Sequence, residues 1–380
     1  MLNNRISSLL IKPAGPDCNL DCTYCFYLNK EKEFAESTIH RMSIKVLEEL
    51  IKQIMTQGGP HISFAWQGGE PTLMGLPFFK KAVEFQIQYS VNKTVSNGLQ
   101  TNGLLINKEW AKFLKEYNFL VGLSLDGPEH IHNRYRITKG QKGSWKDVHS
   151  TAKMLISERV ETNALTVVND YSANFSEEIY NFHKGLGLNF MQFIPCVETD
   201  PTNPLQAAPY SVSEGKYGEF LIKIFDLWFA DIKNGVATTS VRYFDSLFHK
   251  YVNLIPPDCT LEKECGVYLV VEHNGNVYPC DFFVENEWKL GNIMNAGIND
   301  MFNSTKQKEF SKMKAKMPKE CWSCTWVSKC YGGCTKDRLR DPEDDGSNHF
   351  CFSYKMFFEH ADEKFKQLAR QWRTNNGIKV

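Results

Sequence analysis

Short apolar runs alternate with amphipathic segments over the first half of the chain. The apolar runs predict buried strands at residues 7–13, 61–67, 95–103, 119–127, 161–169 and 189–195. Apolar residues at helical spacing predict helices between them, at 43–55, 76–89, 107–117, 144–158 and 176–187. Ser43 and Asn107 stand where helix N-caps belong. Strands that alternate with helices indicate βαβ units and a parallel sheet.

About six such units fit, which is fewer than the eight of a closed TIM barrel. We therefore expect an α/β fold in which residues 1–197 form a partial (β/α)6 barrel. Residues 198–254 read as a linker followed by two helices, whose aromatic stripes are typical of core packing. Cysteine-rich sequence with a hairpin signal at Asn274-Gly275 fills residues 255–365, and 366–380 are a C-terminal tail after a closing helix.

Charge and composition exclude several classes of protein. The chain has 44 Lys plus Arg and 44 Asp plus Glu, so its formal net charge is zero. It therefore has no overall positive charge that would favour binding to nucleic acid or to an anionic membrane. No apolar run reaches the length of a membrane span, and the N-terminus lacks the pattern of a signal peptide. We expect a cytoplasmic protein with a sizeable core.

The 12 cysteines are clustered. Three lie between Cys18 and Cys25, eight lie between Cys259 and Cys351, and Cys196 stands alone without an assigned role. Scattered buried thiols would show no such grouping, and a reducing compartment disfavours disulfides. The clustering therefore indicates metal binding.

Unusual sequences follow the first four predicted strands. The cysteine triplet comes after the first, residues 67–71 (QGGEP) after the second, 100–103 (QTNG) after the third and 124–127 (SLDG) after the fourth. The carboxyl ends of strands line the active site in parallel sheets and barrels. We expect these segments to meet there.

Cys18-x3-Cys22-x2-Cys25 offers three thiolates, whereas a closed zinc site needs four ligands. Three thiolates suit a 4Fe–4S cluster with one open iron; half of a zinc site, or a disulfide pair beside one thiol, is the alternative. With Tyr24 beside the last cysteine, the spacing resembles the signature of the radical S-adenosylmethionine (radical SAM) enzymes. The resemblance implies that S-adenosylmethionine binds the open iron as a cosubstrate and yields a 5′-deoxyadenosyl radical.

The resemblance also implies contacts with that cofactor. The positions concerned are Tyr27, Gly68, Gly69, Glu70, Ser124, Arg136 and Val197. The two glycines let backbone approach the methionyl amino group, and Glu70 orients their loop. Arg136 suits the methionyl carboxylate, with Arg134 as its rival. An ordinary strand-to-helix bend is the alternative for the glycines, and a core contact is the alternative for Val197.

Eight downstream cysteines suffice for two four-cysteine sites, and spacing alone leaves zinc and iron–sulfur open. The run "CWSCTWVSKCYGGC" resembles the SPASM-type extension of peptide-modifying radical enzymes, which carries two auxiliary 4Fe–4S clusters. By that pattern one cluster takes Cys259, Cys265, Cys280 and Cys334, and the other takes Cys321, Cys324, Cys330 and Cys351. Three 4Fe–4S clusters are thus expected, with two structural zinc sites as the alternative to the auxiliary pair.

Several stretches together narrow the resemblance. "KPAGPDCNLDCTYCFYLNK", "FAWQGGEPTLMGLPFF", "GLSLDGP", "MQFIPC" and "VVEHNGNVYPCDFFV" resemble the anaerobic sulfatase-maturating enzymes, over nearly the whole chain from Ile11 to about Phe365. That family oxidises a Cys or Ser of a sulfatase to Cα-formylglycine, so the implied partner bears a Cys/Ser-x-Pro/Ala-x-Arg motif. A flavodoxin or ferredoxin is the implied electron donor.

The chemistry requires a base near the substrate, and Asp281 matches the family's catalytic base. Its place directly after Cys280 sets the base beside an electron sink, although a surface carboxylate is the commonest fate of an aspartate. Gln67 and Tyr27 match substrate-contacting positions, and Tyr27 has packing as its alternative. Two other functions remain open: another SPASM-type enzyme that crosslinks a peptide, and a non-catalytic zinc or iron–sulfur scaffold. Crosslinking enzymes often carry an N-terminal peptide-binding domain, for which a first strand near Ser7 leaves no room.

Overall fold

The computed structural model describes residues 5–35, 37–233 and 235–377, and its contacts divide the chain into two compact units. Unit 1 comprises Met1–Ser124, Tyr135–Thr162 and Gly266–Ser311. Unit 2 comprises Leu125–Arg134, Asn163–Cys265 and Lys312–Val380. Each unit therefore combines segments that lie far apart in the sequence.

Unit 1 contains the first four strands that the hydrophobic pattern predicts. Its strands are β1 (Ser8–Lys12), β2 (His61–Trp66), β3 (Thr94–Thr101), β4 (Leu120–Ser124), β10 (Leu269–Glu272), β11 (Asn276–Tyr278) and β12 (Gly291–Asn292). Its helices are α1 (Ile44–Gln57), α2 (Leu76–Tyr89), α3 (Lys108–Glu116), α5 (Trp145–Ser157) and α9 (Ile298–Phe302), and α10 (Thr305–Ala315) runs on into unit 2. β1 to β4 are parallel neighbours in that order, so the expected parallel α/β arrangement is confirmed.

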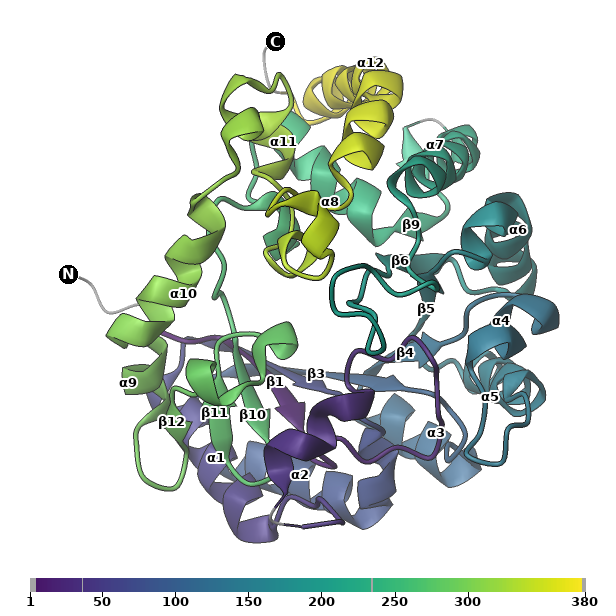
Figure 1. Cartoon of the computed structure of the whole chain (residues 1–380). Coiled ribbons are helices and arrows are strands. Elements are labelled where there is room, and N and C mark those ends of the chain that lie inside the picture. The colour runs from purple at the N-terminus through teal and green to yellow at the C-terminus, as the bar shows by residue number, and fades with distance from the viewer. Residues whose placement is uncertain (1–4, 36, 234, 378–380) are drawn as a thin grey trace. The chain divides into compact units, whose positions relative to one another are not determined.

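The hairpin predicted around Asn274-Gly275 is confirmed as the antiparallel pair β10 and β11, with Gly275 at φ +83°. The position of this hairpin in the sheet was not predicted from the sequence. β10 also runs parallel to β1, and the register sets Glu272 opposite Lys12. Figure 1 shows the green hairpin beside the purple first strand. Part of the cysteine-rich segment thus extends the sheet of the N-terminal strands.

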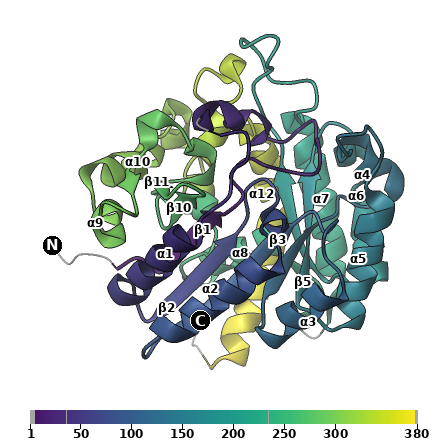
Figure 2. The ribbon, with the colours of Figure 1, turned by 90° about the horizontal axis from the view of Figure 1, so that it is seen from below.

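The predicted caps are confirmed in unit 1. Ser43 Oγ accepts a hydrogen bond from the backbone N–H of Val46 at 3.2 Å, and Asn107 Oδ1 accepts one from Trp110 at 3.1 Å. Each bond satisfies one of the amide groups that a helix start leaves unpaired. α1 and α2 pack side by side and cover β2 and β3 in Figure 2.

Unit 2 contains the fifth and sixth predicted strands. Its strands are β5 (Thr162–Val168), β6 (Phe190–Pro195), β7 (Ile232–Lys233), β8 (Val236–Ala237) and β9 (Ser240–Val241), of which β5, β6 and β9 are parallel neighbours. Its helices are α4 (Glu129–Tyr135), α6 (Ser176–Leu186), α7 (Glu214–Ala230), α8 (Arg242–Tyr251), α11 (Val327–Cys330) and α12 (Cys351–Asn375). α4, α9, α10 and α11 were not anticipated from the sequence, whereas the closing helix is confirmed as α12.

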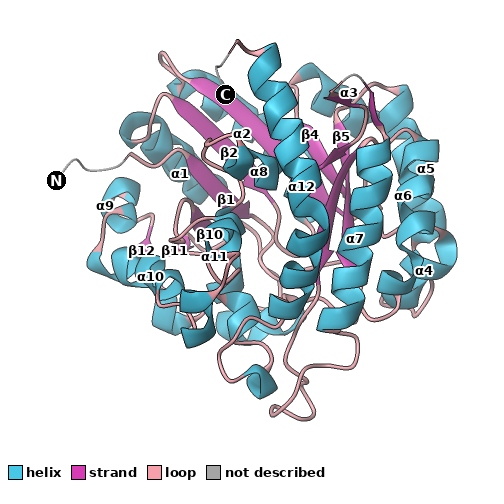
Figure 3. Cartoon of the chain, turned by 90° about the horizontal axis from the view of Figure 1, so that it is seen from above, coloured by secondary structure: helices cyan, strands magenta, loops and turns pink. Residues whose placement is uncertain are grey.

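Aromatic side chains form the core of unit 2. α7 and α12 lie side by side, as Figure 3 shows. The rings of Phe225 and Phe365 are 5.0 Å apart between centroids, and those of Phe244 and Phe357 are 5.3 Å apart. The aromatic stripes on α7 and α8 therefore serve core packing, as expected. In the ranges that the structure describes, no helix is long and apolar enough to cross a membrane.

His183 makes the stability of unit 2 depend on pH. It is fully buried on α6, its Nε2 lies 3.0 Å from Thr166 Oγ1, and burial lowers its pKa from 6.5 to about 4. The unfolded chain therefore binds a proton at a higher pH than the folded chain, and stability is lost as the pH falls from 6.5 toward 4. Between about pH 7.5 and 5.5, the unfolding free energy should fall by about 1 kcal/mol more in the wild type than in His183→Asn.

Urea denaturation under anaerobic conditions, followed by circular dichroism, measures this difference. His61→Asn is the matched control, because His61 is exposed at the start of β2. Its unfolding free energy should follow that of the wild type across the same pH range. Equal pH dependence in the wild type and in His183→Asn would show that His183 is not buried in its neutral form.

Candidate active site

The cysteine triplet lies in the loop that leaves β1, and a second segment of unit 1 holds that loop. The backbone N–H of Asp21 donates to Ile137 O at 2.8 Å, and that of Thr23 donates to Tyr135 O at 3.3 Å. An isolated antiparallel bridge joins Leu20 to Thr138. Residues 135–138 are therefore fixed beside the Cys18–Cys25 loop, as are the side chains that they carry.

Polar groups surround the Cys18 thiol. The backbone N–H of Leu20 lies 3.4 Å from Cys18 Sγ, and Asn102 Nδ2 lies 3.8 Å from it. Burial raises the pKa of Cys18 to about 12, and the negative charges of Glu70 and Cys25 raise it as well. A bound cation is what would hold such a buried sulfur as a thiolate. Sequence reasoning singled out the "QTNG" stretch by its position after a strand, but it assigned no role to Asn102 within that stretch.

Gly68 and Gly69 allow the loop after β2 to pack against backbone. A Cβ on Gly69 would lie 2.1 Å from the carbonyl oxygen of Asp17, and Gly68 has a φ of +125°. The Gly69 N–H donates to Gly15 O at 2.9 Å. The glycines thus seat this loop on the segment that precedes Cys18.

Glu70 is 1% exposed and joins the loops after β2 and β3. Its carboxylate accepts hydrogen bonds from the hydroxyl of Thr101 at 2.8 Å, from the hydroxyl of Thr72 at 2.6 Å and from the N–H of Asn102 at 2.8 Å. Burial raises its pKa, and these bonds oppose that rise. The carboxylate therefore orients the loops that flank Cys18.

Arg136 and Ser124 also belong to unit 1. Arg136 is 7% exposed, and its guanidinium lies 5.5 Å from the ring of Tyr24. In the sequence, Tyr24 stands between Cys22 and Cys25. Arg134, its rival, instead stacks on Tyr171 within unit 2. Ser124 is buried at the end of β4. Of the two arginines, the structure places Arg136 beside the cysteine loop.

A buried ion pair joins Asp281 to Lys12. Lys12 ends β1 and is 1% exposed; Asp281 follows Cys280 and is 7% exposed. Gln67 Nε2 donates a hydrogen bond to Asp281 Oδ2 at 2.7 Å. The carboxylate is thus held in place between the ammonium of Lys12 and the amide of Gln67.

Tyr27 continues this network. Its hydroxyl hydrogen-bonds to Glu272, its ring lies 3.3 Å from the Lys12 ammonium, and its side chain is 2% exposed. Burial raises its pKa well above 10, as does the adjacent carboxylate of Glu272, so the phenol keeps its proton. The environment of Tyr27 is largely that of a packed aromatic side chain, which was the alternative to a functional role. Its contact with cofactor or substrate stays a prediction. Lys12 and Glu272 were missed from the sequence, although a charged residue that ends an apolar strand was the available signal.

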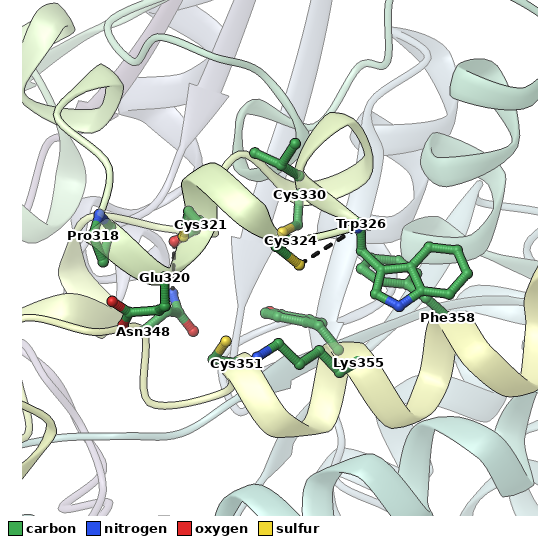
Figure 4. Close-up of a pocket in the computed structure, with 13 residues that line it drawn as sticks. Pro318, Glu320, Cys321, Cys324, Trp326, Cys330, Asn348, Cys351, Lys355 and Phe358 are labelled. Carbon is green, nitrogen blue, oxygen red and sulfur yellow. Dashed lines mark hydrogen bonds between the residues drawn. The ribbon is translucent and has the colours of Figure 1, made fainter.

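The second auxiliary set is assembled within unit 2. Figure 4 shows the sulfur atoms of Cys321, Cys324, Cys330 and Cys351 around one pocket. The N–H of Trp326 lies 3.4 Å from Cys324 Sγ, which suits a thiolate acceptor. Three neighbouring cysteines and the more distant Cys351 thus line one site.

The first auxiliary set is divided between the units. Cys259, Cys265 and Cys334 lie in unit 2, whereas Cys280 lies in unit 1, where its sulfur is 3.6 Å from the Tyr268 hydroxyl. Burial raises the pKa of Cys259 to about 12, and the thiolate of Cys265 adds to the rise. Cys259 and Cys265 are therefore close enough to share a metal group.

The distance between ligand sulfur atoms differs between an iron–sulfur site and a zinc site. Sulfurs around one tetrahedral zinc would be roughly 3.8 Å apart, given Zn–S bonds of about 2.3 Å. Across the described residues, the group of three ligand atoms that come within 4.8 Å of one another is Asp341, Asp344 and His349, and no cysteine set is so tight. Within each unit, the described cysteines are therefore spaced more widely than the ligands of one tetrahedral zinc ion.

The Asp341, Asp344 and His349 group does not suit a metal. His349 Nδ1 lies 3.0 Å from an oxygen of each carboxylate, and its Nε2 lies 3.0 Å from Val212 O. Both ring nitrogens thus face oxygen atoms of the chain itself, and neither points to an open position for an ion. The group instead fixes the loop that leads to Cys351.

Val197 and Cys196 lie at the end of β6 in unit 2. Val197 is 0% exposed within the apolar core of that unit, so packing accounts for its environment, and the expected adenine contact stays a prediction. Burial raises the pKa of Cys196 to about 12. Cys196 is thus a buried thiol.

Comparisons with known proteins identify the family. The profile of the Radical SAM superfamily matches residues 13–182, and that of the SPASM iron–sulfur cluster-binding domain matches residues 263–325. A cysteine-type anaerobic sulfatase-maturating enzyme of Clostridium novyi is 40% identical over 366 residues, covering 96% of this chain and 97% of that protein. A serine-type anaerobic sulfatase-maturating enzyme of Bacteroides thetaiotaomicron is 37% identical over 393 residues, covering 98% and 94%.

A solved structure gives the same result. Native anSMEcpe with bound AdoMet and Cp18Cys peptide matches this chain with a TM-score of 0.86 at 40% identity, covering 96% of this chain and 98% of that one. Similarity of this degree, over nearly the full length of both chains, extends to sequence and fold alike. The chain belongs to the anaerobic sulfatase-maturating enzymes, a family of radical SAM oxidoreductases with a SPASM-type domain.

Proposed function

We propose that this chain oxidises one Cys or Ser side chain of a sulfatase to Cα-formylglycine. Its relatives are named for sulfatase maturation, and both the cysteine-type and the serine-type enzymes are among them. The observation that carries the proposal is the buried carboxylate of Asp281, which Lys12 and Gln67 hold in place directly after Cys280. A metal-binding scaffold would not require a base there.

Cys18, Cys22 and Cys25 would hold a 4Fe–4S cluster with one iron open to S-adenosylmethionine. When bound, this pair supplies a 5′-deoxyadenosyl radical that removes a hydrogen atom from the substrate Cβ. Gly68, Gly69, Ser124 and Arg136 would contact the cofactor, and the Arg136 guanidinium suits its carboxylate. Asn102 and Glu70 would act on this site by orienting the cysteine loop.

Asp281 would accept the proton that leaves the substrate thiol or hydroxyl. One hydrogen atom, one proton and one electron leave in total, which is a two-electron oxidation. A Ser substrate gives the aldehyde directly, whereas a Cys substrate gives a thioaldehyde that water converts to aldehyde and hydrogen sulfide. Lys12 forms an ion pair with the Asp281 carboxylate, and Gln67 fixes the orientation of that carboxylate through Oδ2. Tyr27 would border the peptide without giving up its phenolic proton.

The two auxiliary four-cysteine sets would hold two further 4Fe–4S clusters, each with full cysteine ligation, which suits electron transfer. A flavodoxin or ferredoxin in the cytoplasm would complete the electron path. We retain the boundaries 1–197, 198–254, 255–365 and 366–380 as a proposal for the domains. The cluster-binding profile over residues 263–325 supports the position of the third segment.

The test is an anaerobic assay of the full chain reconstituted with iron and sulfide. We would add S-adenosylmethionine, a reductant and a peptide with Cys-x-Pro-x-Arg, and follow the peptide by mass spectrometry and by its reaction with a hydrazine reagent. We expect an aldehyde and 5′-deoxyadenosine to form together. A matched Ser peptide measures the preference between the two substrate residues.

Two other outcomes would contradict the proposal. Cofactor cleavage with both peptides unchanged would indicate a radical enzyme that acts on a different peptide. Bound zinc without iron, or no cofactor cleavage, would indicate a scaffold. A control peptide with Ala in place of the reacting Cys should stay unchanged.

A further inference from the structure

Two buried cations lie among the auxiliary cysteines of unit 2. Lys314 is 0% exposed and Arg338 is 5% exposed. Lys314 Nζ donates to the carbonyl oxygens of Cys259 at 2.7 Å and Thr260 at 2.8 Å, and it also bonds to that of Glu262. Its three donors are thus used by neutral backbone groups around the first auxiliary set.

Arg338 uses backbone carbonyls in the same way. Its Nε donates to Gly332 O at 2.9 Å, its Nη2 to Tyr331 O at 2.9 Å and its Nη1 to Lys314 O at 3.0 Å and Lys316 O at 3.3 Å. A Cβ on Gly332 would lie 2.5 Å from Arg338 Nη2, so the glycine is what admits the guanidinium. The cation sits against the loop between Cys330 and Cys334.

No carboxylate compensates these charges. Among the residues that the structure describes, neither Lys314 nor Arg338 takes part in an ion pair, and burial lowers the pKa of both. The largest opposing effects come from cysteine thiolates. For Lys314 these are Cys265, Cys259 and Cys334; for Arg338 they are Cys321, Cys265, Cys334 and Cys330.

Two like charges buried side by side without an anion would be strongly destabilising. A 4Fe–4S cluster with four thiolates is a net anion, and its reduction adds one further negative charge. A nearby cation therefore stabilises the reduced form more than the oxidised form and raises the reduction potential. The clusters, when bound, are the anions that would compensate the charges of Lys314 and Arg338.

We infer that Lys314 and Arg338 are positioning residues that set the reduction potentials of the auxiliary clusters, Arg338 acting on both clusters and Lys314 on the first alone. The inference rests on the proposed function, because it requires two clusters at these cysteines. It assigns unequal roles to the two cations. Arg338 bonds to the loop between Cys330 of the second set and Cys334 of the first, whereas Lys314 bonds to the backbone at Cys259 of the first set.

The experiment uses the full chain with Cys18→Ala, Cys22→Ala and Cys25→Ala as the parent, so that only auxiliary clusters are present. Iron and sulfide contents are measured first, and potentials are then determined by redox titration followed by electron paramagnetic resonance. In Arg338→Gln, the oxidised-to-reduced ratio of both clusters at a fixed solution potential should rise about tenfold, which is about 59 mV for a one-electron couple. In Lys314→Gln, one cluster should shift to a more negative potential and the other should not.

Further variants separate charge from loop packing. Arg338→Lys keeps the positive charge but loses most of the carbonyl bonds, and it should titrate like the parent. Lys364→Gln is the control for net charge, because Lys364 pairs with Asp226 in the same unit away from the cysteines. Equal shifts in Arg338→Lys and Arg338→Gln would overturn the inference, as would unchanged potentials at full iron content.

The result also distinguishes this inference from the proposed function. A parent chain that holds zinc or no iron would overturn both, because the auxiliary clusters would not exist. A parent that holds both clusters while the potentials of the variants do not move would overturn only the role of the cations. Should Arg338→Gln fail to retain iron, Lys314→Gln decides by the same criterion: a shift of one cluster supports the inference, and no shift overturns it.

Discussion

Replacing Asp281 with asparagine is expected to lower aldehyde formation by roughly 10²- to 10⁴-fold while cleavage of S-adenosylmethionine continues. The amide keeps the shape of the side chain but does not accept the substrate proton. Hydrogen abstraction from Cβ does not require that base, so 5′-deoxyadenosine should still form. Anaerobic turnover, with both products measured in the same sample, checks the expectation.

Cluster content must be measured with this variant, because Asp281 follows Cys280 and its loss leaves the buried Lys12 without its carboxylate. Asp300→Asn is the matched control, since Asp300 is an exposed aspartate on α9 of the same unit. It should retain wild-type turnover. Full aldehyde formation by Asp281→Asn with normal clusters would show that another group is the base.

Gly69→Ala is expected to abolish use of the cofactor, with cleavage reduced by roughly 10²-fold or more. The added Cβ would lie 2.1 Å from the Asp17 carbonyl oxygen, and neither atom belongs to a side chain that can rotate away. The loop after β2 or the segment before Cys18 would have to move, which displaces the cysteine triplet. Iron content and the rate of 5′-deoxyadenosine formation measure the effect, and the auxiliary clusters should remain.

Gly185→Ala provides the matched control for Gly69→Ala. Gly185 lies within α6, and nothing approaches within 4 Å of the Cβ that would be added there. Alanine is favoured over glycine in a helix by roughly 0.5–1 kcal/mol, so this variant should be at least as stable as the wild type and fully active. A normal cleavage rate in Gly69→Ala would mean that the loop does not constrain the cofactor site.

The cysteine sets show how much of a metal site the spacing of cysteines in the sequence can predict. The separation of three and then two residues within Cys18–Cys25 specifies an open site, because a short loop keeps its thiols close. The eight downstream cysteines extend over residues 259–351, and although four of them lie in one short run, spacing alone does not say which residues share a site. For Cys321, Cys324, Cys330 and Cys351, folding places the start of α12 across a pocket from α11 and so completes the set.

The two arginines make the same point at the cofactor site. Arg134 and Arg136 are equivalent in sequence as partners for a carboxylate. The backbone bonds from Asp21 and Thr23 to residues 135–137 place Arg136 over Tyr24, while Arg134 stacks on Tyr171. Only a contact between segments that are distant in sequence distinguishes them.

The sequence by itself determined the alternation of strands and helices, the helix caps, the hairpin and the candidate residues after each strand. All of these depend on periodicity or on neighbours within a few positions. The tertiary structure alone decided that β10 lies beside β1, and therefore that Lys12 meets Asp281 and Tyr27 meets Glu272. Each pair joins residues that are separated by most of the chain. Local sequence propensity does not predict such pairs, because the charged strand ends meet only when whole strands are buried beside one another.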